Sequence, residues 1–444
     1  MKIYRPDFPA AAPVPMDAGT TTGQQPLSAV PLLDIQRQHA PLRGEMAAAL
    51  ERVLDSGKYI LGPECEHLER NLEAYLQTKH AVGCASGSDA LLLALMALGI
   101  GPGDEVIVPS YTFFATASAV WRLGAMPVFV DIDPATYCLN PRHVQARLTR
   151  ATKAIIPVHL FGQCADLQTL REVAAPHQIP LVEDAAQAIG AKFQGQSAGT
   201  IGEIGCFSFY PTKNLGGIGD GGMLTTNNDE LAARLKLLRG HGMEPRYYHQ
   251  VVGINSRLDS LQAAALNVKL PYLPHWVAHR AANAARYHEM FHDRGLDRVL
   301  GLPVTAAYGE HAWNQYVVRV PDGRRDALRQ YLTQCKVGTE IYYPLALHEQ
   351  ACFRSLGYSA GSLPESERAA RETLALPIFP ELTTTEMQTV VYRIAEYFGV
   401  RRTAAPQPVA APVPIPRPVF LDREPLQNAA APAAYVQYVV NGSL

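Results

Sequence analysis

Between residues 89 and 239, short apolar runs alternate with helical patterns, and this alternation constrains the fold more than any other feature of the sequence. Several of the runs are continuously apolar, as is typical of strands that are covered on both faces. Strand–helix–strand alternation predicts the α/β class, with a mostly parallel sheet flanked by helices. The expected strands are 105–108, 127–131, 154–159, 180–183, 204–209 and 223–226, and the expected helices are 89–98, 112–123, 166–175 and 229–239.

The pattern also divides the chain into four parts. Residues 1–31 are rich in Pro, Ala, Thr and Gly, and we expect a disordered lead-in. Residues 32–272 carry the alternation and form the expected large domain. From residue 273 helical stretches mix with short strands such as 315–320, which predicts a smaller C-terminal α+β domain over 273–400. Residues 401–444 are proline-rich and are expected to form an extended tail, either a plain tail or a segment that docks a partner.

Composition narrows the classes of function. The chain has 444 residues, with 39 Lys and Arg against 41 Asp and Glu, so the net charge is −2 and a dedicated nucleic-acid binder is not expected. Hydrophobic residues make up 48% and can fill a large core. Seven scattered cysteines without a Cys-x-x-Cys pair favour a reducing cytosol over a disulfide framework. The first thirty residues lack a signal-peptide pattern, and the longest apolar run, 90–100, is short of the ~20 residues that span a bilayer. We therefore expect a cytoplasmic α/β enzyme without a membrane partner.

Two motifs point to other chemistry but lack the required context. Gly217 to Gly222 satisfies the spacing of a dinucleotide fingerprint, yet such a loop must open a helix, and here it leads into a strand-like run. His275 and His279 have the spacing of a zinc-binding pair, but neither an adjacent Glu nor a third ligand accompanies them. We therefore expect neither a dinucleotide nor a metal.

A lysine and an acid follow two of the expected strands. Lys213 lies in a Pro- and Gly-rich loop just past the run 204–209, with Ser208 nearby as a possible anion contact. A desolvated lysine can form a Schiff base with an aldehyde, whereas the alternative is an ordinary surface lysine. Asp184 follows the run 180–183, where ligands sit in open α/β sheets. This acid is either a helix cap or the counter-charge of a ligand's protonated nitrogen.

Two further segments could contact a ligand. A small-residue turn opens onto the apolar helix at 89–98, where Ser88 or Asp89 is the expected cap and the free amides would bind a phosphate. Phe113 follows the strand 105–108 directly, so its ring could stack on an aromatic cofactor or pack into the core.

Taken in this order, these segments resemble the DegT family of pyridoxal-phosphate (PLP) dependent nucleotide-sugar aminotransferases. The resemblance covers about residues 32–398 and leaves out only the two Pro-rich ends. It implies the fold-type-I aminotransferase architecture, in which 32–272 is a large PLP-binding domain and active sites form in a homodimer. The matching stretches are 59–63 (YILGP), 86–91 (SGSDAL), 127–133 (PVFVDID), 182–187 (VEDAAQ), 208–214 (SFYPTKN), 219–222 (GDGG), 255–264 (NSRLDSLQAA) and 343–348 (YPLALH).

The resemblance assigns four residues to the cofactor's ring. Lys213 matches the lysine that bonds to PLP as a Schiff base and later moves a proton. Asp184 matches the acid that pairs with the pyridine nitrogen, and keeping that nitrogen protonated makes PLP an electron sink. Gln187 matches the residue near the 3-oxygen, and Phe113 matches the aromatic side chain that stacks on the ring.

Four more residues match phosphate contacts in the family. Ser88, Asp89 and Ser208 correspond to contacts made within one subunit. Asn255 corresponds to an asparagine that reaches the phosphate from the partner subunit. The resemblance therefore implies that PLP, or its pyridoxamine phosphate form, lies between two copies of the chain.

Within the family, the stretches 158–166 and 241–259 are most similar to the branch that aminates UDP-linked 3-keto-glucuronate. Arg257 would pair with a sugar carboxylate or diphosphate, or alternatively make a salt bridge at an interface. Tyr343 and His348 are expected in the sugar pocket. The resemblance implies L-glutamate as the amine donor and a UDP- or dTDP-linked 3-keto sugar as the acceptor, giving an amino sugar for surface polysaccharide or glycoside synthesis.

Two alternatives come from the same family. Sugar dehydratases of the family carry histidine at the position of Lys213, so the lysine argues against that reaction. A regulatory relative without catalysis would have lost site residues, whereas this chain retains the matched set. It also has no recognisable helix-turn-helix or basic extension.

Overall fold

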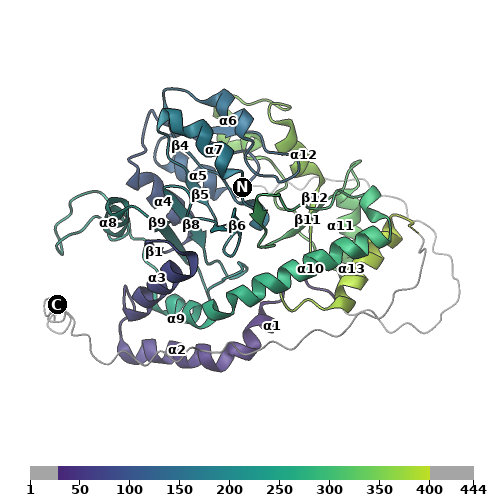
Figure 1. Ribbon diagram of the computed structural model, residues 1–444, viewed down its shortest axis with the longest axis horizontal. Coiled ribbons are helices and arrows are strands. Elements are labelled where there is room, and N and C mark those ends of the chain that lie inside the picture. The colour runs from purple at the N-terminus through teal and green to yellow at the C-terminus, as the bar shows by residue number, and fades with distance from the viewer. Residues whose placement is uncertain (1–28, 401–444) are drawn as a thin grey trace, which may run out of the picture. The chain divides into compact units, whose positions relative to one another are not determined.

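The computed structural model describes residues 29–400 (Figure 1). The expected lead-in and tail therefore lie almost wholly outside the described residues. The boundaries expected at 31, 272 and 400 remain predictions.

The described chain is built around seven strands in the order β3-β2-β4-β5-β8-β9-β1. Parallel bridges at Ile155–Leu181 and Val158–Asp184 join a three-stranded and a four-stranded sheet into this order. Only β9 runs against the others, which confirms the expected mostly parallel sheet. The strands are β1 (His80–Cys84), β2 (Glu105–Pro109), β3 (Met126–Val130), β4 (Thr152–Ile155), β5 (Val182–Asp184), β8 (Ile204–Ser208) and β9 (Gly222–Thr226).

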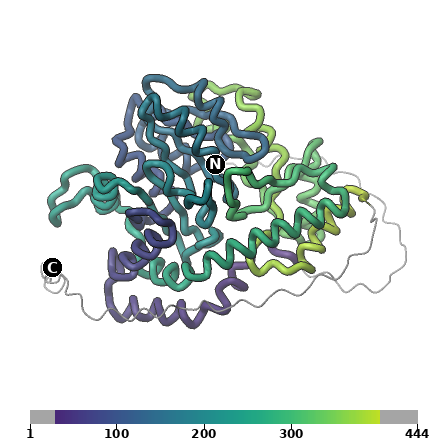
Figure 2. Tube along the Cα trace, in the orientation of Figure 1, coloured from purple at the N-terminus to yellow at the C-terminus, as the bar shows by residue number. Residues whose placement is uncertain are grey.

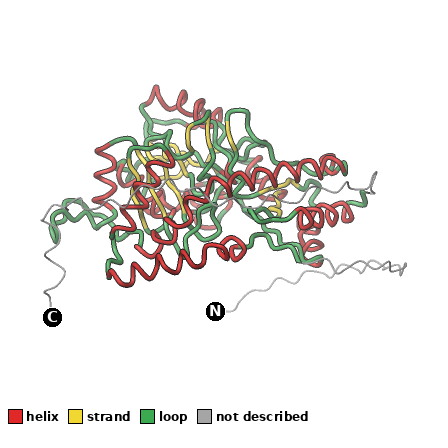
Figure 3. Tube along the Cα trace, turned by 60° about the horizontal axis from the view of Figure 1, so that its bottom comes forward, coloured by secondary structure: helices red, strands yellow, loops and turns green. Residues whose placement is uncertain are grey.

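Helices cover both faces of this sheet, and Figure 3 shows its yellow strands lying among red helices. Side chains of β2 alternate between the two covers: Ile107 packs in the cluster of α3, α7 and α9, while Val106 and Val108 pack with α4, α5 and α8. Because both faces are covered, the strands have continuously apolar sequences. The covering helices are α3 (Pro63–Leu76), α4 (Gly87–Ala97), α5 (Ala115–Arg122), α6 (Pro141–Arg147), α7 (Leu167–Ala174), α8 (Asp229–Leu238) and α9 (Ser260–Lys269).

The C-terminal part has its own apolar cluster around a two-stranded sheet. Strands β11 (Tyr316–Arg319) and β12 (Thr373–Leu376) pair antiparallel and pack against α10 (Leu273–Asp293), α11 (Arg325–Gln334) and α13 (Thr384–Tyr397). Figure 2 shows α10 as a long green tube that runs from beside the large sheet into this cluster. Helices and a short sheet together form the expected α+β arrangement.

The start of the described chain packs on that same C-terminal cluster. Val30 is buried there, and its amide donates to Lys336 O at 3.0 Å. The remaining elements are α1 (Ile35–His39), α2 (Arg43–Ser56), α12 (Pro364–Glu372), β6 (Lys192–Phe193), β7 (Gln196–Ser197), β10 (Gly309–Glu310) and the 3-10 helices η1 (Ala40–Leu42), η2 (Leu160–Gly162), η3 (Ala175–His177), η4 (Leu270–Tyr272), η5 (Leu296–Arg298), η6 (Leu347–Glu349) and η7 (Ala351–Leu356).

Each of the expected strands and helices corresponds to an observed element, with shifted ends. The run expected at 154–159 forms a shorter strand, after which Val158 makes only a single bridge to Asp184. The helix expected from residue 112 begins at Ala115, because residues 112–114 form the turn that follows β2. Among the described residues, no helix is both long and apolar enough to cross a membrane.

Candidate active site

A cavity of about 580 Å³ lies where several strands of the large sheet end. Strands β5 and β8 end at Asp184 and Ser208, and α4 begins beside them. Ligands of open α/β sheets bind at this position, beyond the carboxyl ends of the strands. The cavity brings together seven of the residues singled out in the sequence: Ser88, Phe113, Asp184, Gln187, Ser208, Lys213 and Tyr343.

Lys213 lines the cavity from the loop that follows β8. Its backbone amide donates to Tyr210 O at 2.8 Å, which closes a tight turn. Burial lowers the pKa of Lys213 to about 8, although the nearby Asp184 carboxylate acts in the opposite direction. A lysine with such a pKa is partly neutral near physiological pH, so its amine can attack a carbonyl carbon. The ordinary surface lysine is therefore the weaker interpretation.

Asp184 is a buried acid that faces the same cavity. Its side chain accepts a hydrogen bond from Thr116 Oγ1 at 2.8 Å and one from Ala186 N at 3.3 Å. Burial raises the pKa of Asp184, and the Thr116 hydroxyl partly offsets that shift. No helix begins at Asp184, so the helix-cap interpretation is wrong. A buried carboxylate in a ligand cavity instead suits a cationic ring nitrogen.

The first turn of α4 forms another wall of the cavity. Ser86 caps the helix by accepting from Asp89 N at 3.1 Å, so the expected cap at Ser88 or Asp89 was wrong by a few residues. The first intrahelical bond runs from Ala90 N to Ser86 O at 2.9 Å, which leaves the amides of Gly87 and Ser88 without an intrahelical acceptor. Such amides suit a phosphate.

Glycine is required at the start of α4 because the helix lies against the end of β8. A Cβ atom on Gly87 would lie only 2.6 Å from Ser208 Cβ. This close approach places Ser208 beside the start of α4, and Ser88 and Ser208 line the same cavity. The side chain of Asp89 is not part of the cavity wall, and its backbone contributes to the cap instead.

An aromatic pair and an amide also line the cavity. The Phe113 ring lies 5.9 Å from the Tyr343 ring, between centroids, and is 55% exposed, so core packing does not account for it. Gln187 Nε2 donates to Tyr343 Oη at 3.2 Å, and Gln187 Oε1 accepts from Phe161 N at 2.7 Å. These bonds fix Gln187 while Phe113 keeps an open ring face.

Three residues named from the sequence lie away from the cavity wall. Asn255 is exposed on the segment before α9, where it bridges to Gly240. Arg257 follows on the same segment, and its Nε is buried without a hydrogen-bond partner among the described residues. His348 is buried, with Nδ1 2.6 Å from Ser110 Oγ and Nε2 3.3 Å from Glu367 Oε1. In this chain alone, His348 therefore braces packing and does not reach the cavity.

The two misleading motifs have structural roles. Gly222 begins β9, so the glycine run leads into a strand, and a Cβ atom on Gly222 would overlap Ser86 O. His275 and His279 lie side by side on α10, with ring centroids 4.0 Å apart and ring planes tilted by 46°. Over residues 29–400 there is no group of three or more His, Cys, Asp or Glu side chains that could hold a metal.

Sequence reasoning missed several residues that shape the cavity. Thr116 holds the Asp184 carboxylate, and Thr112 lines the cavity. The two hydroxyls are four residues apart in the segment that carries Phe113, and this one-turn spacing was the signal in the sequence that they lie together. Tyr342 and Gln315 reach the cavity from the C-terminal part, and nothing in their local sequence indicated it. The cavity is therefore lined both by the segment after β2, through Thr112, and by the C-terminal part, through Tyr342 and Gln315.

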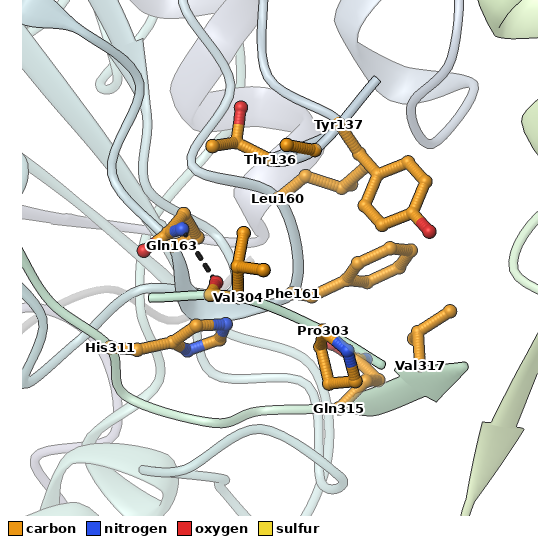
Figure 4. Close-up of a pocket in the computed structure, with 11 residues that line it drawn as sticks. Thr136, Tyr137, Leu160, Phe161, Gln163, Pro303, Val304, His311, Gln315 and Val317 are labelled. Atoms are coloured by element: carbon orange, nitrogen blue, oxygen red, sulfur yellow. Dashed lines mark hydrogen bonds between the residues drawn. The ribbon is translucent and has the colours of Figure 1, made fainter. Parts of the chain in front are cut away.

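A second, much smaller cavity lies beside the first and is shown in Figure 4. Gln163 Nε2 donates to Val304 O at 2.9 Å across it, and Leu160 and Gln315 line both cavities. His311 also lines it, but burial lowers the pKa of this imidazole to about 3, so it stays neutral. With about 10 Å³ of space, this cavity holds at most about one water molecule.

The larger cavity offers a partner for each part of PLP. Lys213 suits its aldehyde and Asp184 its ring nitrogen, while Phe113 offers a face for its ring. The amides of α4 and the Ser208 hydroxyl suit its phosphate. A seven-stranded, mostly parallel sheet with this donor set at its strand ends defines the class of fold-type-I PLP-dependent enzymes.

The chain belongs to the DegT/DnrJ/EryC1/StrS aminotransferase family, which it matches over residues 41–395. It is 48% identical over 369 residues to a pleiotropic regulatory protein of Geobacillus stearothermophilus, covering 83% of this chain and 98% of the relative. It is 45% identical over 368 residues to the dTDP-3-amino-3,4,6-trideoxy-alpha-D-glucose transaminase of Streptomyces venezuelae, covering 83% and 96%. A third relative is the UDP-2-acetamido-2-deoxy-3-oxo-D-glucuronate aminotransferase of Pseudomonas aeruginosa, 41% identical over 362 residues, covering 81% and 98%.

Solved structures agree with this assignment. The fold is similar to that of DesV from Streptomyces venezuelae in complex with a ketimine intermediate, with a TM-score of 0.80, 44% identity and coverage of 83% of this chain and 98% of that one. It is also similar to NtdA from Bacillus subtilis with bound PMP, with a TM-score of 0.79, 32% identity and coverage of 84% and 86%. The chain is thus a PLP-dependent sugar aminotransferase, as the sequence motifs predicted.

Proposed function

We propose that this chain transfers the amino group of L-glutamate to a UDP- or dTDP-linked 3-keto sugar. The observation that carries the proposal is the meeting of Lys213 and Asp184 in one cavity at the ends of β8 and β5. Two relatives are named as transaminases of a dTDP-linked and a UDP-linked sugar, which supports the acceptor class. The product would be an amino sugar used in surface polysaccharide or glycoside synthesis.

The side chains would divide the work as follows. PLP, when bound, draws electrons from the bond that breaks at the donor's Cα. Lys213 would hold the cofactor covalently and, once displaced, its amine would carry the proton away from that Cα. Asp184 would keep the ring nitrogen protonated, and Thr116 orients its carboxylate. Gln187, fixed by Phe161 N, would face the ring's 3-oxygen.

The remaining cofactor contacts are part of the same proposal. Phe113 would stack on the ring, while Ser88 and Ser208 would hold the phosphate together with the free amides of α4. Asp89 would contribute its backbone through the cap rather than its side chain.

The phosphate site would be completed in a homodimer. Asn255 is exposed and lies outside the cavity of its own chain, which suits a contact given by Asn255 of the partner subunit. Large apolar side chains lie exposed on the segment before it, including Tyr247, Tyr248 and Val252. An interface would cover this apolar surface, since exposed patches of this kind mark interaction sites.

The sugar would bind between the cofactor and the C-terminal part. Tyr343 lines that side of the cavity. Arg257 lies outside the cavity of its own chain, with a buried Nε that has no partner among residues 29–400, and would reach the sugar from the partner subunit. A guanidinium of this kind would pair with a diphosphate or a sugar carboxylate. His348 would act indirectly, because both of its nitrogens contact protein side chains. We further propose that the enzyme works in the cytoplasm, where nucleotide sugars and reduced cysteines would be available.

The test is to incubate the purified holoenzyme with L-glutamate and each of a panel of UDP- and dTDP-linked 3-keto and 4-keto sugars, and to identify products by mass spectrometry. We expect an amino sugar and 2-oxoglutarate in equal amounts with a 3-keto sugar. Products from 4-keto sugars alone would overturn the assigned keto position. No amino sugar from any member would overturn the proposal.

A regulatory role is the second candidate, because the Geobacillus relative carries that description. The presence of Lys213 and Asp184 in the cavity favours catalysis over a purely regulatory role, and it also argues against the dehydratase alternative. Lys213→Ala separates the two roles, because it would abolish amino transfer and leave a regulatory function in cells intact.

A further inference from the structure

The residue directly after Lys213 is tied to the C-terminal part of the chain. Asn214 is only 2% exposed. Its Nδ2 donates to Ala312 O at 2.9 Å, and its Oδ1 accepts from Asn314 Nδ2 at 3.0 Å. Both polar ends of the amide are therefore satisfied by one short segment, 312–314, almost one hundred residues away in sequence.

That segment is itself firmly held. Arg280 of α10 is 2% exposed, and its Nη1 donates to Trp313 O at 3.1 Å and to Asn314 O at 3.3 Å. Ala312 N donates to Gly162 O at 2.9 Å. A guanidinium and a backbone bond thus fix the backbone of the segment 312–314, which carries the carbonyl and the side chain that Asn214 contacts.

The other end of the lysine loop is held by α9. The buried ammonium of Lys269 donates to Gly216 O, and Gln262 Oε1 accepts from Ile218 N at 2.9 Å. The loop is therefore held at two places: α9 binds its backbone at Gly216 and Ile218, and the Asn214 side chain anchors the residue next to Lys213. Because a lysine side chain has several rotatable bonds, the position of its amine depends on how firmly its backbone is fixed.

We propose that Asn214 is a positioning residue, which directs Lys213 Nζ into the cavity by tying the lysine loop to the segment 312–314. The inference rests on the proposed role of Lys213. It adds that the C-terminal part, which also contributes Gln315 and Tyr342 to the cavity, sets the geometry of the amine. Misplacement of a reacting group by about 1 Å costs on the order of 100-fold in rate.

The chain offers a matched control. Asn71 Nδ2 donates to Asn267 Oδ1 at 3.1 Å, which joins α3 to α9 by the same kind of amide pair. Neither residue lines the cavity. Asn71→Ala reports what the loss of an amide–amide bond does to this fold, because Lys269 and Gln262, the α9 residues that hold the lysine loop, keep their own bonds to it.

The experiment compares Asn214→Ala and Asn71→Ala with the wild type. The readouts are the melting temperature of the apo-protein, the dissociation constant of PLP, the pH midpoint of the bound cofactor's absorbance, and kcat and KM for L-glutamate. For Asn214→Ala we expect PLP to bind about tenfold more weakly, the absorbance midpoint to move, and kcat to fall on the order of 100-fold with a nearly unchanged KM. For Asn71→Ala we expect only a lower melting temperature.

A milder variant covers the case in which Asn214→Ala does not fold. Asn314→Ala removes one of the two bonds to Asn214, so we expect about half of each free-energy change: PLP binds about threefold more weakly and kcat falls about tenfold. A variant that folds with wild-type PLP affinity, absorbance midpoint and kcat overturns the inference. If the wild type does not take up PLP on Lys213 at all, the proposed function fails instead, so the two failures are distinguishable.

Discussion

Two adjacent acids show how environment assigns roles at the scale of single residues. Along β5, Glu183 and Asp184 point to opposite faces of the sheet. The Glu183 carboxylate accepts from Gly199 N and Ile201 N, each at 2.7 Å, and lies 2.8 Å from His159 Nε2. Burial raises the pKa of Glu183, but these hydrogen bonds prevail and lower it overall. Asp184 faces the cavity and accepts fewer hydrogen bonds from the protein, so its carboxylate remains available to a cationic ligand.

Asp184→Asn is expected to keep the fold and bind PLP, but to lose amino transfer on the order of 100-fold, because a neutral amide cannot hold the ring nitrogen's charge. Single-turnover rates with L-glutamate measure this. Asp131→Asn is the control. Asp131 is buried, lies outside the cavity and accepts a hydrogen bond from Ser366 N at 2.7 Å, so its substitution should affect stability alone. Equal turnover by Asp184→Asn with full PLP occupancy would refute the role.

The lowered pKa of Lys213 gives a pH prediction. Only the neutral amine attacks an aldehyde, and burial lowers this pKa to about 8. As pH rises through that value the neutral fraction grows, so the rate at which apo-protein takes up PLP should rise from pH 7 and level off near pH 9. Stopped-flow absorbance provides the measurement. A rate that still climbs steeply above pH 9, as for a lysine with an ordinary pKa of about 10.4, would contradict the assigned environment.

At the scale of elements, the end of β2 organises a wall of the cavity. Tyr111 is buried just after this strand, and its hydroxyl lies 2.6 Å from Thr373 Oγ1 and accepts from Tyr343 N at 3.1 Å. The same hydroxyl donates to Tyr342 O. One side chain of the large sheet thus fixes both tyrosines that the C-terminal part contributes to the cavity.

Tyr111→Phe should lower the free energy of unfolding by roughly 1–3 kcal/mol, because the Tyr343 amide and Thr373 hydroxyl lose a buried partner. It should also raise KM for the keto-sugar nucleotide more than KM for L-glutamate. Urea denaturation and steady-state kinetics with each substrate measure the two effects. If both KM values stay at wild-type levels, the hydroxyl stabilises the fold without shaping the sugar site.

The sequence predicts elements better than their ends or caps. Continuous apolar runs are unambiguous where helices cover both faces, so β2, β3 and β8 were found. Strand β1 was missed, because its five residues include Gly83 and Ala81 and its apolar run is short. The cap of α4 was misplaced because Ser86, Ser88 and Asp89 are all good caps, and only the approach of the chain before the helix decides among them.

At the scale of the whole described chain, the cavity is assembled from segments of both the large sheet and the C-terminal part. The sequence predicted the cavity segments that follow strands, since the carboxyl ends of parallel strands meet at one edge of the sheet. It could not predict Gln315 or Tyr342, because their position depends on how the C-terminal part packs against residues such as Tyr111 and Asn214.

A shared active site predicts complementation between two impaired variants. Lys213→Ala lacks the amine, and Asn255→Ala lacks the proposed phosphate contact of the partner subunit. Mixed dimers, formed by refolding the two together, would contain one site with both residues intact. We expect Lys213→Ala alone to be inactive and Asn255→Ala alone to be weakened by the loss of one phosphate contact. The mixture should be more active than the sum of the two variants measured separately. Lack of recovery despite mixed dimers, verified by differently tagged subunits, would contradict a site shared through Asn255.

The central claim is that the amine of Lys213 bonds to PLP. The most direct measurement is borohydride reduction of the PLP-loaded protein, followed by proteolysis and mass spectrometry of every lysine-containing peptide. The account predicts one peptide heavier by a reduced phosphopyridoxyl group, with the modification on Lys213 and absent from Lys213→Ala. Modification of a different lysine, or of none while PLP remains bound, would contradict it.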